Sequence, residues 1–201
     1  MDRIKPKDIQ FVQNLSRFDK LYWSVPDLEK ILRLKNRKSL LVTLHRLVKY
    51  GIFTRIRRGI YRLSTRSFDV AALANLLYTP SYLSFESALS RYGVLSQVPY
   101  IYTFATRRRS KKMTVDGSVV EFRQLQDKLF FGYRLENGLF IADAEKAFLD
   151  ALYLMRRGKT DLPLEEMNYA GLSKQKLRKY ALPFPPYVQK ALKELKGIPR
   201  I

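Results

Sequence analysis

The chain of 201 residues contains no cysteine and a single histidine, His45. The lack of cysteine excludes disulfide bonds, thiolate zinc sites and cysteine nucleophiles together, and it fits a reducing cytoplasm. With one histidine, neither a histidine-based catalytic triad nor a histidine metal site is expected. The nine glycines are scattered, without the GxxxxGK or GxGxxG spacing of phosphate-binding loops. We therefore expect no bound metal or other cofactor.

Long apolar runs are also missing. No segment of about 18 apolar residues is present, and no basic start leads into an apolar stretch with a small-residue cleavage site. The sequence therefore predicts a cytoplasmic protein that neither spans a membrane nor is secreted.

Acidic residues are few, with 18 Asp and Glu against 38 Lys and Arg, for a net charge of +20. Such a charge attracts polyanions, of which nucleic acid is the commonest. Residues 1–63 carry a net +11, and the other 138 residues carry only +9. No acid occurs between Glu29 and Asp69, an interval that holds Lys30, Arg33, Lys35, Arg37, Lys38, Arg46, Lys49, Arg55, Arg57, Arg58, Arg62 and Arg66. A solvated face normally mixes charges, so this apolar-rich interval predicts a folded surface that faces phosphates.

Two helices are expected in the first part of the chain. Residues 7–18 form the first, whose buried side is either Ile9, Val12 and Leu15 or Phe11 and Leu15. The second begins after Ser24, a good N-cap, with a proline and an aspartate in its first turn. Its buried positions are Leu28, Ile31 and Leu32, with Leu34 packing near its end.

A third helix is expected at residues 39–50, after a turn at 35–38, and it ends at Gly51. One arc of its helical wheel collects Leu40, Leu41, Leu44, Leu47 and Val48. The opposite arc collects Lys35, Lys38, Ser39, Val42, Arg46 and Lys49, with Thr43 at its edge. A recognition helix needs this division, because one face packs on the other helices while the other enters the major groove.

Residues 52–63 read as two strands about an Arg57-Arg58-Gly59 turn. Three helices followed by a hairpin with arginines at its tip predict a winged helix-turn-helix over residues 1–63. The residues expected to face double-stranded DNA are Lys35, Arg37, Lys38, Ser39, Val42, Thr43, Arg46, Lys49, Arg55, Arg57 and Arg58. The same small fold also serves as a protein-interaction module, which would show no salt-dependent affinity for DNA.

Residues 64–201 predict a second, mixed α+β domain, so the fold class of the chain is α+β. This domain begins with a polar link at 64–69. Helices are expected at 70–77, 85–92, 144–157, 173–180 and 187–195, and strands at 100–106, 113–115, 119–123, 130–135 and 139–142. The basic run at 107–112 is either a solvated loop, an extension of the DNA footprint or a contact for an acidic or RNA-bound partner.

A catalytic site is not expected. Asp143 and Glu145 precede and open a helix, where acids favour the helix dipole, and Asp150 lies about 140° around that helix from Glu145. Glu121 and Arg123 resemble a nuclease Glu-x-Lys strand only loosely, because arginine does not accept protons. We therefore predict that the protein is not an enzyme. A nucleic-acid-processing enzyme with a winged targeting domain is the alternative, and loss of metal-dependent cleavage on mutation of Asp143 or Glu121 would reveal it.

Three segments, in order, resemble the AbiEi-type antitoxins. Residues 44–61 (LHRLVKYGIFTRIRRGIY) are similar to the family's N-terminal winged helix, and residues 82–93 (YLSFESALSRYG) to its S-x-x-S/T-A-L-x-x-x-G segment. Residues 144–154 (AEKAFLDALYL) resemble its EKA-x-x-D-x-x-Y helix. The resemblance as a whole covers roughly residues 25–155, and the last forty or so residues match only in helical character.

This resemblance implies the antitoxin of a toxin–antitoxin or phage-defence operon. The N-terminal domain would repress its own operon, and the second would counteract a nucleotidyltransferase-like toxin, by contact or by competing for its RNA target. Glu145, Lys146 and Asp150 form the candidate antitoxin motif, for which a structural role is equally open. The alternative is a stand-alone regulator whose second domain senses a ligand or oligomerises, and the neighbouring gene would distinguish the two.

Overall fold

The computed structural model describes residues 4–18, 20, 22–32, 36–65 and 69–195. The chain is a mixed α+β protein with two separate sheets. It divides into two compact units, Met1–Phe68 and Asp69–Ile201, called here the first and second units. Within the described residues, every helix is too short or too polar to cross a membrane.

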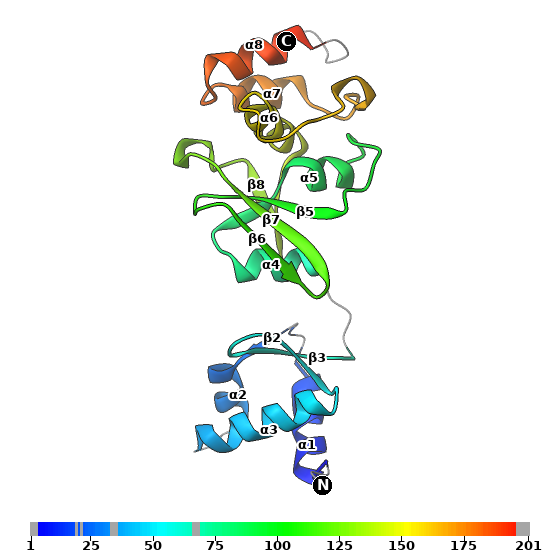
Figure 1. Ribbon diagram of the computed structural model, residues 1–201, viewed down its shortest axis with the longest axis vertical. Helices are drawn as coiled ribbons and strands as arrows, with labels where there is room; N and C mark the ends of the chain where they lie inside the picture. The colour runs from blue at the N-terminus through cyan, green and yellow to red at the C-terminus, as the bar shows by residue number, and fades with distance from the viewer. Residues whose placement is uncertain (1–3, 19, 21, 33–35, 66–68, 196–201) are drawn as a thin grey trace. The chain divides into compact units, whose positions relative to one another are not determined.

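The first unit consists of three helices and a small antiparallel sheet (Figure 1). Its elements are α1 (Pro6–Ser16), β1 (Trp23–Ser24), α2 (Val25–Leu32), α3 (Arg37–Lys49), β2 (Phe53–Arg57) and β3 (Ile60–Leu63). The strand order is β1-β3-β2. The pairing of β1 with β3 was not expected from the sequence, because two residues carry no recognisable strand pattern.

The core of the first unit is made by apolar residues from all three helices and the sheet. Phe11 and Leu15 face it, whereas Ile9 is 54% exposed, so the second of the two interpretations of α1 is correct. The ring of Phe11 stacks on that of Phe53 with 5.7 Å between centroids. The remaining buried members of the core are Trp23, Val25, Leu28, Leu40, Leu44, Leu47, Tyr61 and Leu63.

Side-chain caps set the starts of α2 and α3. The Ser24 N–H and hydroxyl donate to Asp27 Oδ2 at 2.9 and 2.7 Å, and the Asp27 N–H donates back to Ser24 Oγ at 3.3 Å. This reciprocal capping confirms the predicted start of α2. Asn36 Oδ1 accepts from the N–H groups of Lys38 and Ser39, so α3 begins two residues earlier than predicted.

The second unit is built on a six-stranded sheet of order β6-β7-β5-β4-β9-β8. The strands are β4 (Ser81–Leu83), β5 (Ile101–Thr106), β6 (Lys111–Val115), β7 (Ser118–Gln124), β8 (Tyr133–Glu136) and β9 (Leu139–Ala142). The pairs β4–β9 and β5–β7 are parallel, and the others are antiparallel. The helices are α4 (Val70–Leu77), α5 (Phe85–Arg91), α6 (Ala144–Met155), α7 (Lys174–Ala181) and α8 (Pro186–Glu194), with short 3₁₀ turns at 127–129 and 164–166.

Helices cover both faces of this sheet (Figure 1). Helix α4 lies on one face and α6 on the other, with α7 and α8 packed outside α6. The buried Asn75 of α4 ties that helix to two strands. Its Nδ2 donates to the Ser81 carbonyl at 2.6 Å, and its Oδ1 accepts from the Phe140 N–H at 2.9 Å. All polar atoms of this side chain therefore have partners inside the protein.

Candidate nucleic-acid interface

The open face of α3 is an arc formed by Lys38, Val42, His45 and Lys49, called here the α3 arc. These residues lie within roughly 60° of one another at about 100° per residue, and all four are exposed. Val42 is 63% exposed although it is apolar. Arg37 and Leu41 extend the arc toward the hairpin, and both are exposed. The prediction that Leu41 is buried is therefore wrong, because α3 packs on the core through positions 40, 44 and 47.

A groove of about 550 Å³ runs between α3 and the β2–β3 hairpin. The helix contributes Arg37, Leu41, His45 and Val48, and the hairpin contributes Arg55, Arg58, Gly59 and Tyr61, with Val25 completing the lining. The lining combines apolar side chains with three arginines. Glu29 Oε1 lies 3.5 Å from Arg37 Nε, but no carboxylate lines the groove itself among the described residues. The remaining positive charge complements a polyanion.

Two backbone features shape the hairpin. Gly59 has φ of +80°, the left-handed conformation that the tight turn after Arg58 requires. The register shifts between Arg55, which is opposite Tyr61, and Arg57, which is opposite Ile60. This bulge bends β2, the outer strand, near its tip. Arg55, Arg57 and Arg58 are all exposed there, as expected from the sequence.

Arg46 does not lie on the α3 arc. Its Nε and Nη2 donate to the two carboxylate oxygens of Asp8 at 3.0 and 2.6 Å, and its side chain is only 11% exposed. Burial alone would raise the pKa of Asp8, but hydrogen bonds from Arg46 and from the Lys5 N–H hold that pKa below its ordinary value. The prediction that Arg46 faces DNA is therefore corrected: it fastens α3 to α1, across 38 residues of sequence.

The other predicted DNA-facing residues have mixed positions. Lys38, Val42 and Lys49 lie on the α3 arc, whereas Ser39 is exposed and Thr43 half-buried on the side of α3 nearer Arg46. Lys35 lies outside the described residues. His45 and Leu41 were missed, although their spacing of four, followed by Val48 three residues later, marks one helical stripe.

The candidate antitoxin motif is inside the second unit. The Asp150 carboxylate pairs with Lys146 and accepts from Tyr82 Oη at 3.0 Å and Ser84 Oγ at 2.9 Å. Lys146 and Asp150 are fully buried, and burial lowers the pKa of Lys146 while the carboxylate opposes that shift. The Lys146 ammonium also lies 5.0 Å from the centroid of the Phe131 ring. These contacts join α6 to Tyr82 of β4 and to Ser84, the residue before α5.

Glu145 and Asp143, the two acids at the start of α6, bind α7 and its flanks. Glu145 Oε1 accepts from the Ser173 N–H at 2.8 Å, and Glu145 is 5% exposed. Asp143 accepts from Tyr180 Oη at 2.8 Å and pairs with Lys176 at 3.2 Å and with Arg134. Burial, followed by the hydrogen bond to Asp143, raises the pKa of Tyr180 to about 12. Neither Glu145, Lys146 nor Asp150 is presented on the surface for a partner.

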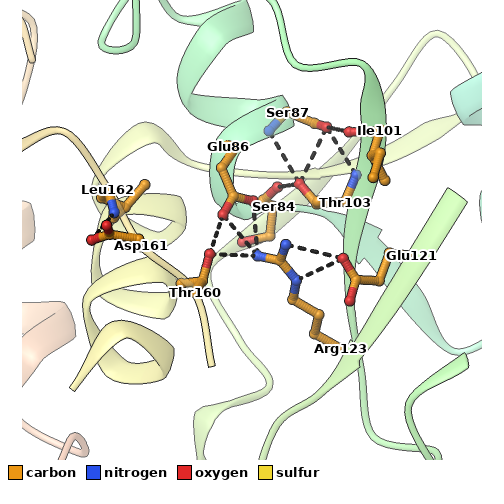
Figure 2. Close-up of polar contacts among 10 residues, drawn as sticks. All are labelled: Ser84, Glu86, Ser87, Ile101, Thr103, Glu121, Arg123, Thr160, Asp161 and Leu162. Carbon is orange, nitrogen blue, oxygen red and sulfur yellow. Dashed lines mark hydrogen bonds and ion pairs between the residues drawn. The ribbon is translucent and has the colours of Figure 1, made fainter. Parts of the chain in front are cut away.

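Figure 2 shows the surroundings of Glu121 and Arg123. Arg123 Nη1 donates to both carboxylate oxygens of Glu86 at 2.8 Å, and its Nη2 donates to Glu121 at 3.0 Å. Thr160 Oγ1 donates to Glu86 at 2.6 Å, which ties the chain after α6 to α5 and β7. Burial would raise the pKa of Glu86, but Arg123 lowers it below the ordinary value. Glu121 and Arg123, which loosely resemble a nuclease strand in sequence, thus form an internal clamp with Glu86, a set of ion pairs that joins β7 to α5.

Next to this clamp, Thr103 joins β5 to the first turn of α5 (Figure 2). Thr103 Oγ1 donates to the Ser84 carbonyl at 2.9 Å and accepts from the Ser87 N–H at 3.1 Å. The described part of the chain holds no group of three or more histidine, aspartate or glutamate side chains placed to bind a metal ion.

Comparisons with known proteins bear on the fold alone. No family model and no curated protein matches the chain. Among solved structures, the RV2827C protein from Mycobacterium tuberculosis is similar, with a TM-score of 0.67 and 17% sequence identity. The similarity covers 96% of this chain and 78% of that chain. The likeness therefore extends to the folds of both units.

Proposed function

We propose that the first unit is a winged helix-turn-helix that binds double-stranded DNA, and that the protein is a sequence-specific transcriptional regulator. The observation that carries this proposal is the cationic groove between α3 and the β2–β3 hairpin. Helices α2 and α3 would form the helix-turn-helix, and the hairpin would be the wing. The alternative of a protein-interaction module leaves the acid-free lining of this groove unexplained.

The two sides of the groove, α3 and the hairpin, would contact different parts of the DNA. The α3 arc would enter the major groove, where Lys38 and His45 reach base edges and Val42 meets a thymine methyl group. Arg55 and Arg58 on the hairpin would bind phosphates or the adjacent minor groove. Arg46 would act as a positioning residue, because its pairing with Asp8 sets how α3 lies on α1.

The resemblance to AbiEi-type antitoxins extends this proposal to a repressor of its own toxin–antitoxin operon. The second unit would then counteract a nucleotidyltransferase-like toxin. Since Glu145, Lys146 and Asp150 are buried, that action would use other residues on the surface. A nucleotidyltransferase-like gene beside this one supports the antitoxin role, whereas its absence favours the stand-alone regulator.

The test compares DNA from upstream of the protein's own gene with a scrambled duplex, over a series of salt concentrations. His45→Ala removes a base-reading side chain and should narrow the preference for the upstream duplex by about 1–3 kcal/mol. Arg55→Ala removes a phosphate contact, so it should weaken both duplexes alike and reduce the salt slope by about 1. Lys174→Ala, an exposed helix cation of the second unit, is the control. If both duplexes bind alike and neither variant matters, the proposal is wrong.

A further inference from the structure

The segment between β5 and β6, residues 107–112 and called here the basic segment, gathers five cations on the second unit. Its members are Arg107, Arg108, Arg109, Lys111 and Lys112, and all five side chains are exposed. The last two begin β6, which is an edge strand of the six-stranded sheet. The segment therefore leads into an edge of the sheet with which no other strand pairs among the described residues.

Hydrogen bonds with Thr106, Tyr78 and Gln124 hold the basic segment in place through its backbone and the Ser110 hydroxyl. The Arg108 N–H donates to Thr106 Oγ1 at 3.1 Å, and Tyr78 Oη donates to the Arg109 carbonyl at 2.8 Å. Gln124 donates from its N–H to Ser110 Oγ at 3.0 Å and from Nε2 to the Arg107 carbonyl at 3.2 Å. The cations are thus displayed from a fixed backbone, which lowers the entropy cost of binding a ligand.

None of these five cations has a carboxylate within 4.0 Å in the part of the chain that the structure describes. Elsewhere on the second unit, carboxylates pair with Arg91, Arg123, Arg134, Arg156, Lys176 and Lys190. The other cations of α7 also lack such a partner among the described residues, so it is the grouping of five within six residues that distinguishes the basic segment. Five like charges held together repel one another, and a polyanion relieves that repulsion. The basic segment therefore has the charge of a phosphate-binding surface.

The aromatic rings beside the basic segment are already covered. The Arg108 guanidinium lies 4.5 Å and the Lys111 ammonium 5.4 Å from the centroid of the Tyr78 ring. Arg107 lies 5.2 Å from the centroid of the Phe130 ring. Single-stranded nucleic acid is held largely by bases that stack on open rings, and cations occupy these rings instead. The arrangement favours the phosphate backbone of a duplex.

Protection of an edge strand is the alternative explanation. Lysines on edge strands prevent pairing with other chains, which accounts for Lys111 and Lys112. It does not account for the three arginines that precede β6, since they lie outside any strand.

We propose that the basic segment binds the phosphate backbone of double-stranded DNA, as a second contact surface separate from the first unit. The choice of a DNA duplex rests on the proposed function of the first unit. The second unit then raises affinity without reading sequence, because phosphate contacts position a protein on DNA and base contacts specify the site.

The test removes three charges from the full-length chain in two places. The first variant is Arg109→Gln, Lys111→Gln, Lys112→Gln, and the matched control is Lys174→Gln, Arg178→Gln, Lys179→Gln on α7. Both lower the net charge by three, and the control cations also have no carboxylate partner in the described chain. Affinity for a 40-base-pair DNA duplex is measured over a salt series. The first variant should lose about 2–3 units of salt slope, and the control should keep its slope.

Equal losses in the two variants would overturn the proposal, since net charge alone would then explain them. An unchanged slope in the first variant would also overturn it, provided circular dichroism shows the fold intact. If the substitutions of the first variant weaken its binding to an RNA duplex but not to a DNA duplex, the choice of DNA is overturned.

A parallel variant of the first unit, Lys38→Gln, Arg55→Gln, Arg58→Gln, separates the two proposals. If only this last variant loses affinity, the first unit binds DNA alone; if only the first variant does, the proposed function fails and the basic segment stands.

Discussion

The groove of the first unit and the interior of the second unit use their charged residues in opposite ways. In the first unit, the α3 arc and the hairpin leave cations around an open groove with an acid-free lining. In the interior of the second unit, Lys146 is paired with Asp150, and Arg123 with Glu86. A lysine or arginine in the sequence therefore indicates neither binding nor packing by itself. What distinguishes the two roles is whether a carboxylate and burial accompany it.

Arg46 combines features of both units. It belongs to the helix that carries the open arc, yet its contacts resemble those of the second unit's interior, because its Nε and Nη2 both donate to the buried carboxylate of Asp8. Variants that break pairs in each unit, or alter exposed ones, test how far the contrast holds.

The largest effect is expected from Lys146→Met. This change leaves the fully buried Asp150 without its cation, and removal of one partner from a buried pair costs about 3–5 kcal/mol. Urea unfolding followed by circular dichroism measures the loss. The double variant Lys146→Met, Asp150→Leu should recover much of it, because no unpaired charge remains. A single variant as stable as the wild type would show that the pairing of Lys146 with Asp150 does not matter for the stability of the second unit.

A smaller effect is expected from Arg46→Met, which leaves Asp8 buried with the hydrogen bond that it accepts from the Lys5 N–H. The first unit should lose about 2–3 kcal/mol. Trp23, the only tryptophan, is buried in that unit, so its fluorescence reports this unfolding separately. The salt slope of DNA binding should stay unchanged under conditions where the variant is folded. A slope reduced by about one unit with no loss of stability would instead restore Arg46 as a DNA contact.

Acid should weaken the first unit through Asp27. Burial raises the pKa of this carboxyl, but hydrogen bonds from Ser24 and Lys20 lower it to about 2, against an ordinary value of 3.8. Because the folded pKa is depressed, the stabilisation is complete above pH ~4 and is lost as the pH falls toward 2. The urea midpoint of Trp23 fluorescence should therefore fall over that range, and Asp27→Asn should flatten the fall. An equal slope in wild type and variant would assign the acid sensitivity to other carboxyls.

The smallest effect is expected from Lys190→Ala. This lysine pairs with Glu194 at 3.8 Å on the surface of α8, where both side chains are more than half exposed. Exposed pairs contribute little, so stability should change by less than about 0.5 kcal/mol in thermal unfolding. A large loss of stability would mean that an ion pair stabilises the protein even when it is exposed, so burial would not be what makes the interior pairs important.

Much of the fold follows from local signals. The predicted bounds of the helix at 70–77 coincide with those of α4, and Gly51 and Gly93 follow α3 and α5 in left-handed conformations. Caps and glycines act within a few residues of the chain, so a sequence displays them directly. Strand β4 was missed because its three residues are too few for an alternating pattern, and its neighbours β5 and β9 are distant in sequence.

The candidate site was predicted only in part, for the same reason. The helical wheel of α3 identified Lys38, Val42 and Lys49, because residues on one helix are related by a fixed rotation. The wheel does not indicate which neighbour covers each side. Asp8 reaches Arg46 from 38 residues away, and Asp150 is buried by strands and helices that meet it only in the folded chain. Pairings of this kind are tertiary, so periodicity alone does not reveal them.

Asn75 has a consequence for how the second unit selects its fold. A leucine at this position would fit an apolar interior, but it would supply neither of the two hydrogen bonds that the Asn75 amide makes. The two ends of the Asn75 amide match Ser81 and Phe140 in one placement only, and any other leaves buried polar groups unsatisfied. Asn75 thus fixes the position of α4 along the sheet, because near-native alternatives would lose its hydrogen bonds to Ser81 and Phe140.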